Sequence, residues 1–187
     1  VYCRGSLELS GSPVIEGNKL TTGESNNLVS YMNKTKITDT LNSDAKIYVY
    51  MKDTSTQDQT LATVDPSVSY AGHFDAKTRM ITLQCEDSTI YHELGHFLAF
   101  VAGNVDTTSS FEAVYNSEKS KFTGVRKAYA TQNASEYFAE SVLNYVENLS
   151  ALKSQRPQTY EAIVNALSKV TDAQITKIMN VYKVVWK

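Results

Sequence analysis

The sequence predicts an α+β protein in which a small N-terminal α/β lobe precedes a C-terminal lobe of helices. Three observations support this prediction. Segments rich in β-branched and aromatic residues lie before residue 85, a capped amphipathic helix is expected at residues 88–101, and helical periodicity continues from there towards the C-terminus. We expect one domain of 187 residues, with an α/β lobe at 1–103 and a helical lobe at 104–187.

The N-terminal lobe is expected to contain one short helix, one isolated strand and one hairpin. Residues 1–23 are rich in Gly, Ser and Thr and are interpreted as an arm or loop. The run KIYVYM is interpreted as a strand, and SYAGHFDAKTRMITLQ as an antiparallel hairpin with a polar turn. The expected elements are a helix at 24–34, a strand at 46–51 and hairpin arms at 70–74 and 80–83.

The segment 88–101 has the pattern of a helix with one apolar face. Asp87 and Ser88 offer N-cap chemistry at its start, and Gly103 with Asn104 offers a C-terminal stop. Five apolar residues recur at helical spacing, which predicts that this face packs against a core. They are Ile90, Leu94, Phe97, Leu98 and Val101.

Helical signals continue through the C-terminal lobe. Pro157 suits the first turn of a helix, where its missing N–H is not needed, and Thr171 with Asp172 marks another start. The predicted helices are 109–122, 135–149, 157–170 and 171–185.

Composition limits the classes of partner. The net charge is −2, so no strong basic field favours nucleic acid, and no apolar run approaches the length of a membrane span. No signal peptide begins the chain as given. Cys3 and Cys85 could pair in an oxidising compartment or be unrelated thiols, and the sequence leaves both open. A monomer is the default expectation.

The predicted helix 88–101 carries the sequence His92-Glu93-Leu94-Gly95-His96. Residues four apart on a helix project from one face, so both imidazoles should point the same way. Two His at this spacing are typical of the zinc pair of a metallopeptidase, with the intervening Glu as general base. The alternative is a surface helix whose two His are simply solvated.

A catalytic zinc ion needs a third protein ligand. Neither Cys follows the motif and no further His does, so a carboxylate on a later helix is expected. Glu136 and Glu140 lie four apart and should share one face of their helix. A solvated acidic stripe that includes Glu147 is the alternative, and spacing alone does not decide between them.

The motif His92-Glu93-Leu94-Gly95-His96, followed by YATQNASEYFAE from Tyr129 to Glu140, resembles the anthrax lethal factor-like family of zinc peptidases, which includes the secreted bacterial Pro-Pro endopeptidases. The resemblance covers about residues 70–170 and implies a gluzincin-like arrangement. By this resemblance Glu136 is the third zinc ligand, Tyr129 assists the transition state, and Glu140 orients a ligand histidine.

The resemblance also implies that the strand around Gly72, His73 and Phe74 holds the substrate. His73 is the only histidine outside the motif, and an ordinary strand histidine is the alternative for it. Extended peptides pair with such strand edges through main-chain hydrogen bonds.

These observations predict a secreted bacterial zinc endopeptidase with one catalytic Zn²⁺, acting on protein or peptide substrates with Glu93 as general base. Whether proline flanks the cleaved bond stays open. Two alternatives stay open as well: a non-catalytic module that uses zinc for stability and binds a peptide or protein, and a toxin effector protease with a single host target.

Overall fold

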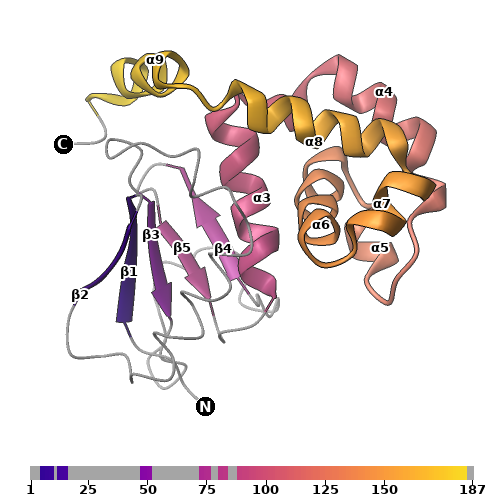
Figure 1. Cartoon of the computed structure of the whole chain (residues 1–187), viewed down its shortest axis with the longest axis horizontal. Helices are drawn as coiled ribbons and strands as arrows, with labels where there is room; N and C mark the ends of the chain where they lie inside the picture. The colour runs from indigo at the N-terminus through magenta and orange to yellow at the C-terminus, as the bar shows by residue number, and fades with distance from the viewer. Residues whose placement is uncertain are drawn as a thin grey trace. The chain divides into compact units, whose positions relative to one another are not determined.

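The computed structural model describes residues 5–10, 12–16, 47–51, 72–76, 80–83 and 88–184 (Figure 1). The chain divides into two compact units, which we call the sheet unit (Val1–Ile90) and the helical unit (Tyr91–Lys187). This division differs from the expected lobe boundary at residue 103, because it assigns nearly all of the helix that carries the His motif to the helical unit. The predicted helix at 24–34, both cysteines and the turn at 77–79 lie outside the described residues.

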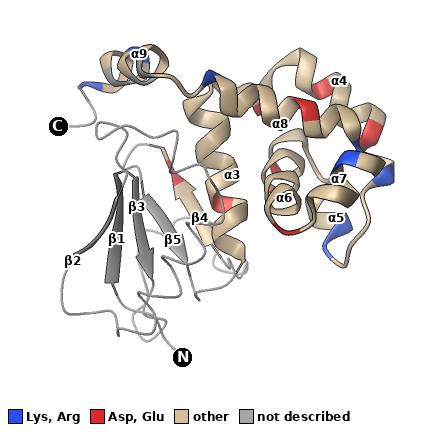
Figure 2. Ribbon diagram, viewed as in Figure 1, with Lys and Arg blue, Asp and Glu red and all other residues tan. Residues whose placement is uncertain are grey.

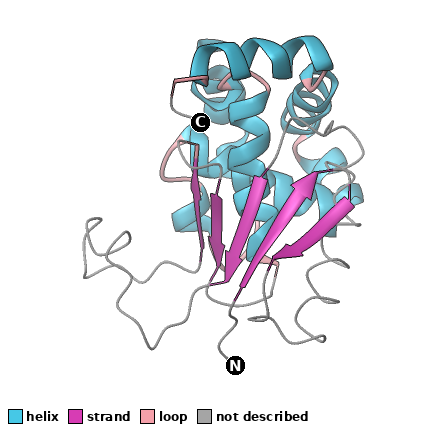
Figure 3. Cartoon of the chain, turned by 90° about the vertical axis from the view of Figure 1, so that its left-hand side faces the viewer, coloured by secondary structure: helices cyan, strands magenta, loops and turns pink. Residues whose placement is uncertain are grey.

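The sheet unit contains a five-stranded mixed sheet, whose strands are drawn in magenta in Figure 3. The strand order is β2-β1-β3-β5-β4, and only β3 and β5 run parallel to each other. The strands are β1 (Gly5–Ser10), β2 (Ser12–Glu16), β3 (Ile47–Met51), β4 (Gly72–Asp75) and β5 (Met80–Leu83).

Three of these strands were predicted and two were not. The strand at β3 and the antiparallel hairpin β4–β5 are confirmed, with Gly72 opposite Leu83. The interpretation of residues 1–23 as an arm or loop was wrong for β1 and β2, which pair with each other and, through β1, with β3. One of the two partners of β1, the strand β3, lies about forty residues further along the chain, and the Gly- and Ser-containing sequence of β1 gives little local signal.

The helical unit is built from helices of very different length. The longer ones are α3 (Thr89–Val101), which begins in the last two residues of the sheet unit, α4 (Ser109–Glu118), α6 (Ala134–Glu147), α8 (Pro157–Lys169) and α9 (Asp172–Tyr182). The shorter ones are η2 (Val105–Thr107), η3 (Lys119–Lys121), α5 (Lys127–Ala130) and α7 (Leu149–Gln155). The five longer helices are those that the sequence predicted, whereas α5 and α7 are too short to show a clear period.

Local chemistry sets several of the helix ends. Gly103 and Asn104, just after α3, both have positive φ (95° and 55°), which confirms the predicted stop. Pro157 occupies the first turn of α8, and the Thr171 hydroxyl caps α9 as expected. The Asn133 side chain accepts a hydrogen bond from Glu136 N and so begins α6.

The core of the helical unit is an aromatic cluster where α4, α6 and α8 pack together. Phe111 contacts Phe138 edge to face, and Tyr115 does the same with Tyr137. The buried Arg156 guanidinium, 4.6 Å from the Phe122 ring centroid, donates to the Ser141 hydroxyl. These contacts fix α6, the helix on which two predicted site residues lie.

Charged residues of both signs are spread over the helices of this unit (Figure 2), as the small net charge leads one to expect. None of the described helices is both long and apolar enough to cross a membrane.

Helices α3 and α6 come into backbone contact at Gly95. A Cβ atom added there would lie 2.7 Å from Ala139 Cα and 2.9 Å from Ala139 O, both closer than such atoms can approach. The small residue therefore sets how near the His motif of α3 lies to the carboxylates of α6.

We expect Gly95→Ala to destabilise the protein, although Gly→Ala inside a helix ordinarily stabilises it by about 0.5–1 kcal/mol. The clashing atoms belong to the backbone of α6 and cannot rotate away, so overpacking should cost about 1–3 kcal/mol. Thermal unfolding should show a lower Tm than wild type, while Ser150→Ala, an exposed change on α7, leaves Tm in place. A raised Tm for Gly95→Ala would mean that α3 and α6 are not in contact here.

Candidate metal centre

The His motif lies on α3, as predicted, and its apolar stripe is buried. His92 and Glu93 are also buried, with only 3% and 4% of their surfaces exposed, whereas His96 is half-buried. The Nε2 atoms of the two histidines are 3.2 Å apart, and their rings meet edge to face with centroids 4.8 Å apart. The one-turn spacing therefore brings the two imidazoles together at a single point.

Glu136, in the first turn of α6, faces the same point. Its Oε2 lies 3.1 Å from His92 Nε2 and 3.7 Å from His96 Nε2. Although both ring nitrogens face it, this buried oxygen has no hydrogen-bond partner of suitable geometry in the described part of the chain. An orphaned buried carboxylate oxygen is costly unless a further group binds it.

The donor set fits a zinc ion. One ligand atom from each of His92, His96 and Glu136 lies within 4.8 Å of the others. Nitrogen and oxygen ligands at about 2.0–2.2 Å from a tetrahedral zinc ion are about 3.3 Å apart, close to the separations found here. His₂Glu is also a donor set of catalytic zinc sites, which leave one position open.

The ionisation of the cluster agrees with this reading. Burial alone would lower the pKa of His92, but Glu136, Glu140 and Glu93 outweigh it and raise the pKa to about 9. Burial alone would raise the pKa of Glu136, yet the two histidines and Tyr129 hold it well below its usual range. Without a metal ion, a proton on His92 balances these carboxylates, and metal binding has to displace it.

Glu140 sets the tautomer of His92. Its Oε2 is 2.9 Å from His92 Nδ1, and both groups are buried. A carboxylate only accepts hydrogen bonds, so Nδ1 carries the proton and donates it. The lone pair of Nε2 is then directed at the metal position, as in the carboxylate–histidine pairs of metal sites.

We expect Glu140→Gln to weaken metal binding by about 10–100-fold, because the replacement no longer holds His92 in this tautomer with a charged acceptor. Competition with a chromogenic chelator would measure the affinity. Glu147→Gln, on the exposed end of the same helix, is the matched control and should bind metal like wild type. Equal affinities for the two variants would show that Glu140 does not act on His92.

Tyr129 lies on the short helix α5, with 46% of its surface exposed. Its ring centroid is 5.8 Å from that of His92, and its hydroxyl lies close enough to the Glu136 carboxylate for the two groups to shift each other's pKa. Burial and the neighbouring Glu136 carboxylate raise the pKa of Tyr129, so the hydroxyl keeps its proton and can donate it in a hydrogen bond.

The helical unit thus brings together six of the predicted site residues, namely His92, Glu93, His96, Tyr129, Glu136 and Glu140. The remaining three, Gly72, His73 and Phe74, lie in β4 of the sheet unit, at one edge of the described sheet. Their predicted role in holding substrate stays a prediction.

Two residues that support α6 were missed. Asn133 caps the helix, and Asn three residues before Glu is a recognisable start signal. Asp106 is buried and accepts a 2.5 Å hydrogen bond from the Ser135 hydroxyl. No local signal predicts that contact, because the two residues are 29 positions apart.

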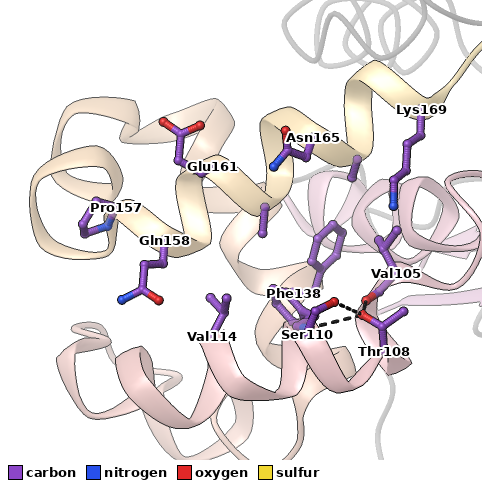
Figure 4. A pocket seen from close by; sticks show the side chains of 13 residues that line it. Val105, Thr108, Ser110, Val114, Phe138, Pro157, Gln158, Glu161, Asn165 and Lys169 are labelled. Carbon is purple, nitrogen blue, oxygen red and sulfur yellow. Dashed lines mark hydrogen bonds between the residues drawn. The ribbon is translucent and has the colours of Figure 1, made fainter.

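A separate cavity of about 510 Å³ opens between α4 and α8 (Figure 4). Its wall is mostly apolar, and none of the predicted site residues lines it. Phe138, which lies between Glu136 and Glu140 in the sequence, points into it, so this cavity and the metal centre use different sides of α6.

Comparison with known families agrees with the resemblance seen in the motifs. A search of curated proteins gave no significant match. The family model described as "Anthrax toxin lethal factor, N- and C-terminal domain" matches residues 15–166, which is most of the chain. The chain therefore belongs to the anthrax toxin lethal factor family, a family of zinc metalloproteases.

Proposed function

We propose that this chain is a zinc-dependent endopeptidase with a gluzincin-like catalytic domain, hydrolysing peptide bonds in protein or peptide substrates. One observation carries the proposal: the donor atoms of His92, His96 and Glu136 converge within 4.8 Å, beside the acid Glu93 and the phenol Tyr129. The family match covers a range of residues and identifies none of them as catalytic. The proposal therefore depends on this cluster rather than on family membership alone.

In the proposed mechanism, His92, His96 and Glu136 would hold a zinc ion, which would acidify a water molecule and polarise the peptide carbonyl. Glu93 is the general base: it takes the proton of the attacking water and later passes it to the leaving amine. Its charge acts on both His92 and Tyr129, which places it beside the cluster.

Tyr129 is proposed to donate its hydroxyl proton in a hydrogen bond to the oxyanion that develops on the carbonyl oxygen. The raised pKa keeps that proton in place at neutral pH. One oxyanion donor of this kind typically contributes about 2.7–4 kcal/mol of transition-state stabilisation. Glu140 keeps His92 oriented as a zinc donor throughout the reaction.

The substrate is proposed to pair with the edge strand β4 through residues Gly72, His73 and Phe74. In the described sheet β4 is bonded to β5 on one side only, and His73 is exposed. An edge of this type accepts an extended peptide through main-chain hydrogen bonds. Export from a bacterial cell is a further proposal, which rests on the family resemblance.

The test is cleavage of a peptide library, read by mass spectrometry with zinc and with a chelator, and with Glu93→Gln alongside. We expect cuts that need zinc and are missing from the variant, and their flanking residues will show whether proline directs cleavage. Zinc-loaded protein that cuts neither the library nor intact proteins would support the non-catalytic binding module. Cleavage of one intact host protein but of no library peptide would support the toxin effector.

A further inference from the structure

Tyr115, on α4, reaches the segment that carries Tyr129. Its side chain is buried, and its hydroxyl donates a 2.6 Å hydrogen bond to the backbone carbonyl of Thr131. Its ring packs edge to face on that of Tyr137, with centroids 5.4 Å apart, and the Lys119 ammonium lies 4.3 Å from the ring centroid. Tyr115 is therefore held between two charged or aromatic neighbours with its hydroxyl aimed at one carbonyl.

Thr131 controls the position of α5. It is the C-cap of this four-residue helix, and both its backbone N–H and its hydroxyl donate to Lys127 O at the start of the helix. A helix this short is not stable by itself. Fixing the Thr131 carbonyl therefore fixes the single turn that contains Tyr129.

Tyr115 also connects this turn with the helix that carries the third donor of the metal centre. Tyr137, the residue against which its ring packs, directly follows Glu136 on α6. One side chain thus contacts α6 next to the third donor with its ring and the end of α5 with its hydroxyl. Tyr129 itself is nearly half exposed, so its own packing does little to hold it, whereas the adjacent Ala130 is fully buried.

We propose that Tyr115 is a positioning residue that holds the Tyr129 hydroxyl in place against the Glu136 carboxylate, so that Tyr129 can serve the reaction. This inference rests on the proposed peptidase function. In that function Tyr115 contacts neither the three donor residues nor the substrate. Its effect passes through Thr131 and the turn of α5. A misplaced oxyanion donor lowers the rate of the chemical step more than it weakens substrate binding.

The test compares Tyr115→Phe with Tyr137→Phe in the full chain. Each variant keeps the aromatic ring and loses one buried hydroxyl. Tyr137→Phe is the control because the Tyr137 hydroxyl bonds Thr159 on α8, at 2.8 Å, and not a residue of α5. We expect Tyr115→Phe to lower kcat by about tenfold with KM and zinc content unchanged. The two variants should lower Tm by similar amounts, because each loses one buried hydrogen bond. Tyr137→Phe should leave kcat within about twofold of wild type. The substrate is the best-cleaved peptide of the library.

A double-mutant cycle with Tyr129→Phe separates positioning from general stability. If Tyr115 acts through the Tyr129 hydroxyl, Tyr115→Phe should have no further effect on kcat once that hydroxyl is gone. An equal tenfold loss in both backgrounds, or a wild-type kcat for Tyr115→Phe, would overturn the inference.

Hydrogen exchange gives a readout that does not need activity. The amides of Ala130 and Thr131 bond Arg126 O and Lys127 O, so they report whether the α5 turn is formed. Peptides covering residues 127–132 should exchange faster in Tyr115→Phe than in wild type. In Tyr137→Phe their exchange rates should equal those of wild type. A zinc-loaded wild type that cuts nothing contradicts the proposed function, while unchanged exchange in Tyr115→Phe contradicts this inference by itself.

Discussion

Replacing Glu93 with Gln should lower the rate of peptide cleavage by about 10²–10⁴-fold, because the amide cannot take the proton of the attacking water. Gln has nearly the same shape as Glu, and Glu93 is buried, so the replacement should fit the space without new voids. Glu93 is not one of the three donors, so the variant should still bind one zinc ion per chain. kcat/KM on the preferred library peptide, with zinc measured by mass spectrometry, would check both halves of this expectation.

The matched control is Glu112→Gln, which removes one carboxylate from an exposed position of α4 and should cleave like wild type. A modest change in zinc affinity for Glu93→Gln is expected, since the Glu93 charge contributes to the raised pKa of His92. If the variant retained wild-type cleavage, another group would be the base. If the variant lost cleavage only because it lost zinc, the loss of zinc would explain the result without a base. The assignment of Glu93 as general base would then fail as well.

This experiment also separates the peptidase from the binding module. A module that uses zinc only for stability has no need of a buried acid beside the donors, so Glu93→Gln should leave partner binding intact. Burying a carboxylate is costly, and buried ionisable groups cluster at functional sites, which is an argument that Glu93 serves chemistry.

The parts of the site that the sequence could predict are those that a single helix determines. His92 and His96 converge because they are one turn apart, and the burial of Ile90 and Leu94 shows that the apolar stripe was interpreted correctly. The hairpin β4–β5 was predictable for the same reason, since its polar turn and its two arms are adjacent in the chain.

The third donor was different, because spacing alone left Glu136 and Glu140 beside a solvated acidic stripe. What separates them is the contact of α3 with α6 at Gly95, which places Glu136 on the Nε2 side of His92 and Glu140 on the Nδ1 side. A contact between residues more than forty positions apart leaves no periodic trace in either helix. Only the family resemblance supplied it in advance, and α5 and Tyr115, which depend on similar distant contacts, had no such signal of their own.

Replacing Glu136 with Gln should remove zinc and activity together. The amide has no negative charge, so the site loses its one anionic donor and keeps two neutral ones, short of the three ligands that a catalytic site provides. We expect no measurable cleavage and less than one tenth of a zinc ion per chain after dialysis. Glu147→Gln, at the exposed end of the same helix, should keep both zinc and activity.

Thermal unfolding makes the same point without a substrate. At free zinc about 1,000 times Kd, binding stabilises the folded state by about 4 kcal/mol, which corresponds to a rise in Tm on the order of 10 °C for a chain of this size. We expect a chelator to lower the Tm of wild type and Glu147→Gln by this amount and to leave Glu136→Gln unchanged. Should Glu136→Gln keep one zinc ion and a chelator-sensitive Tm, the orphaned Oε2 would need another partner, and the third ligand would have to be sought among the other carboxylates facing His92.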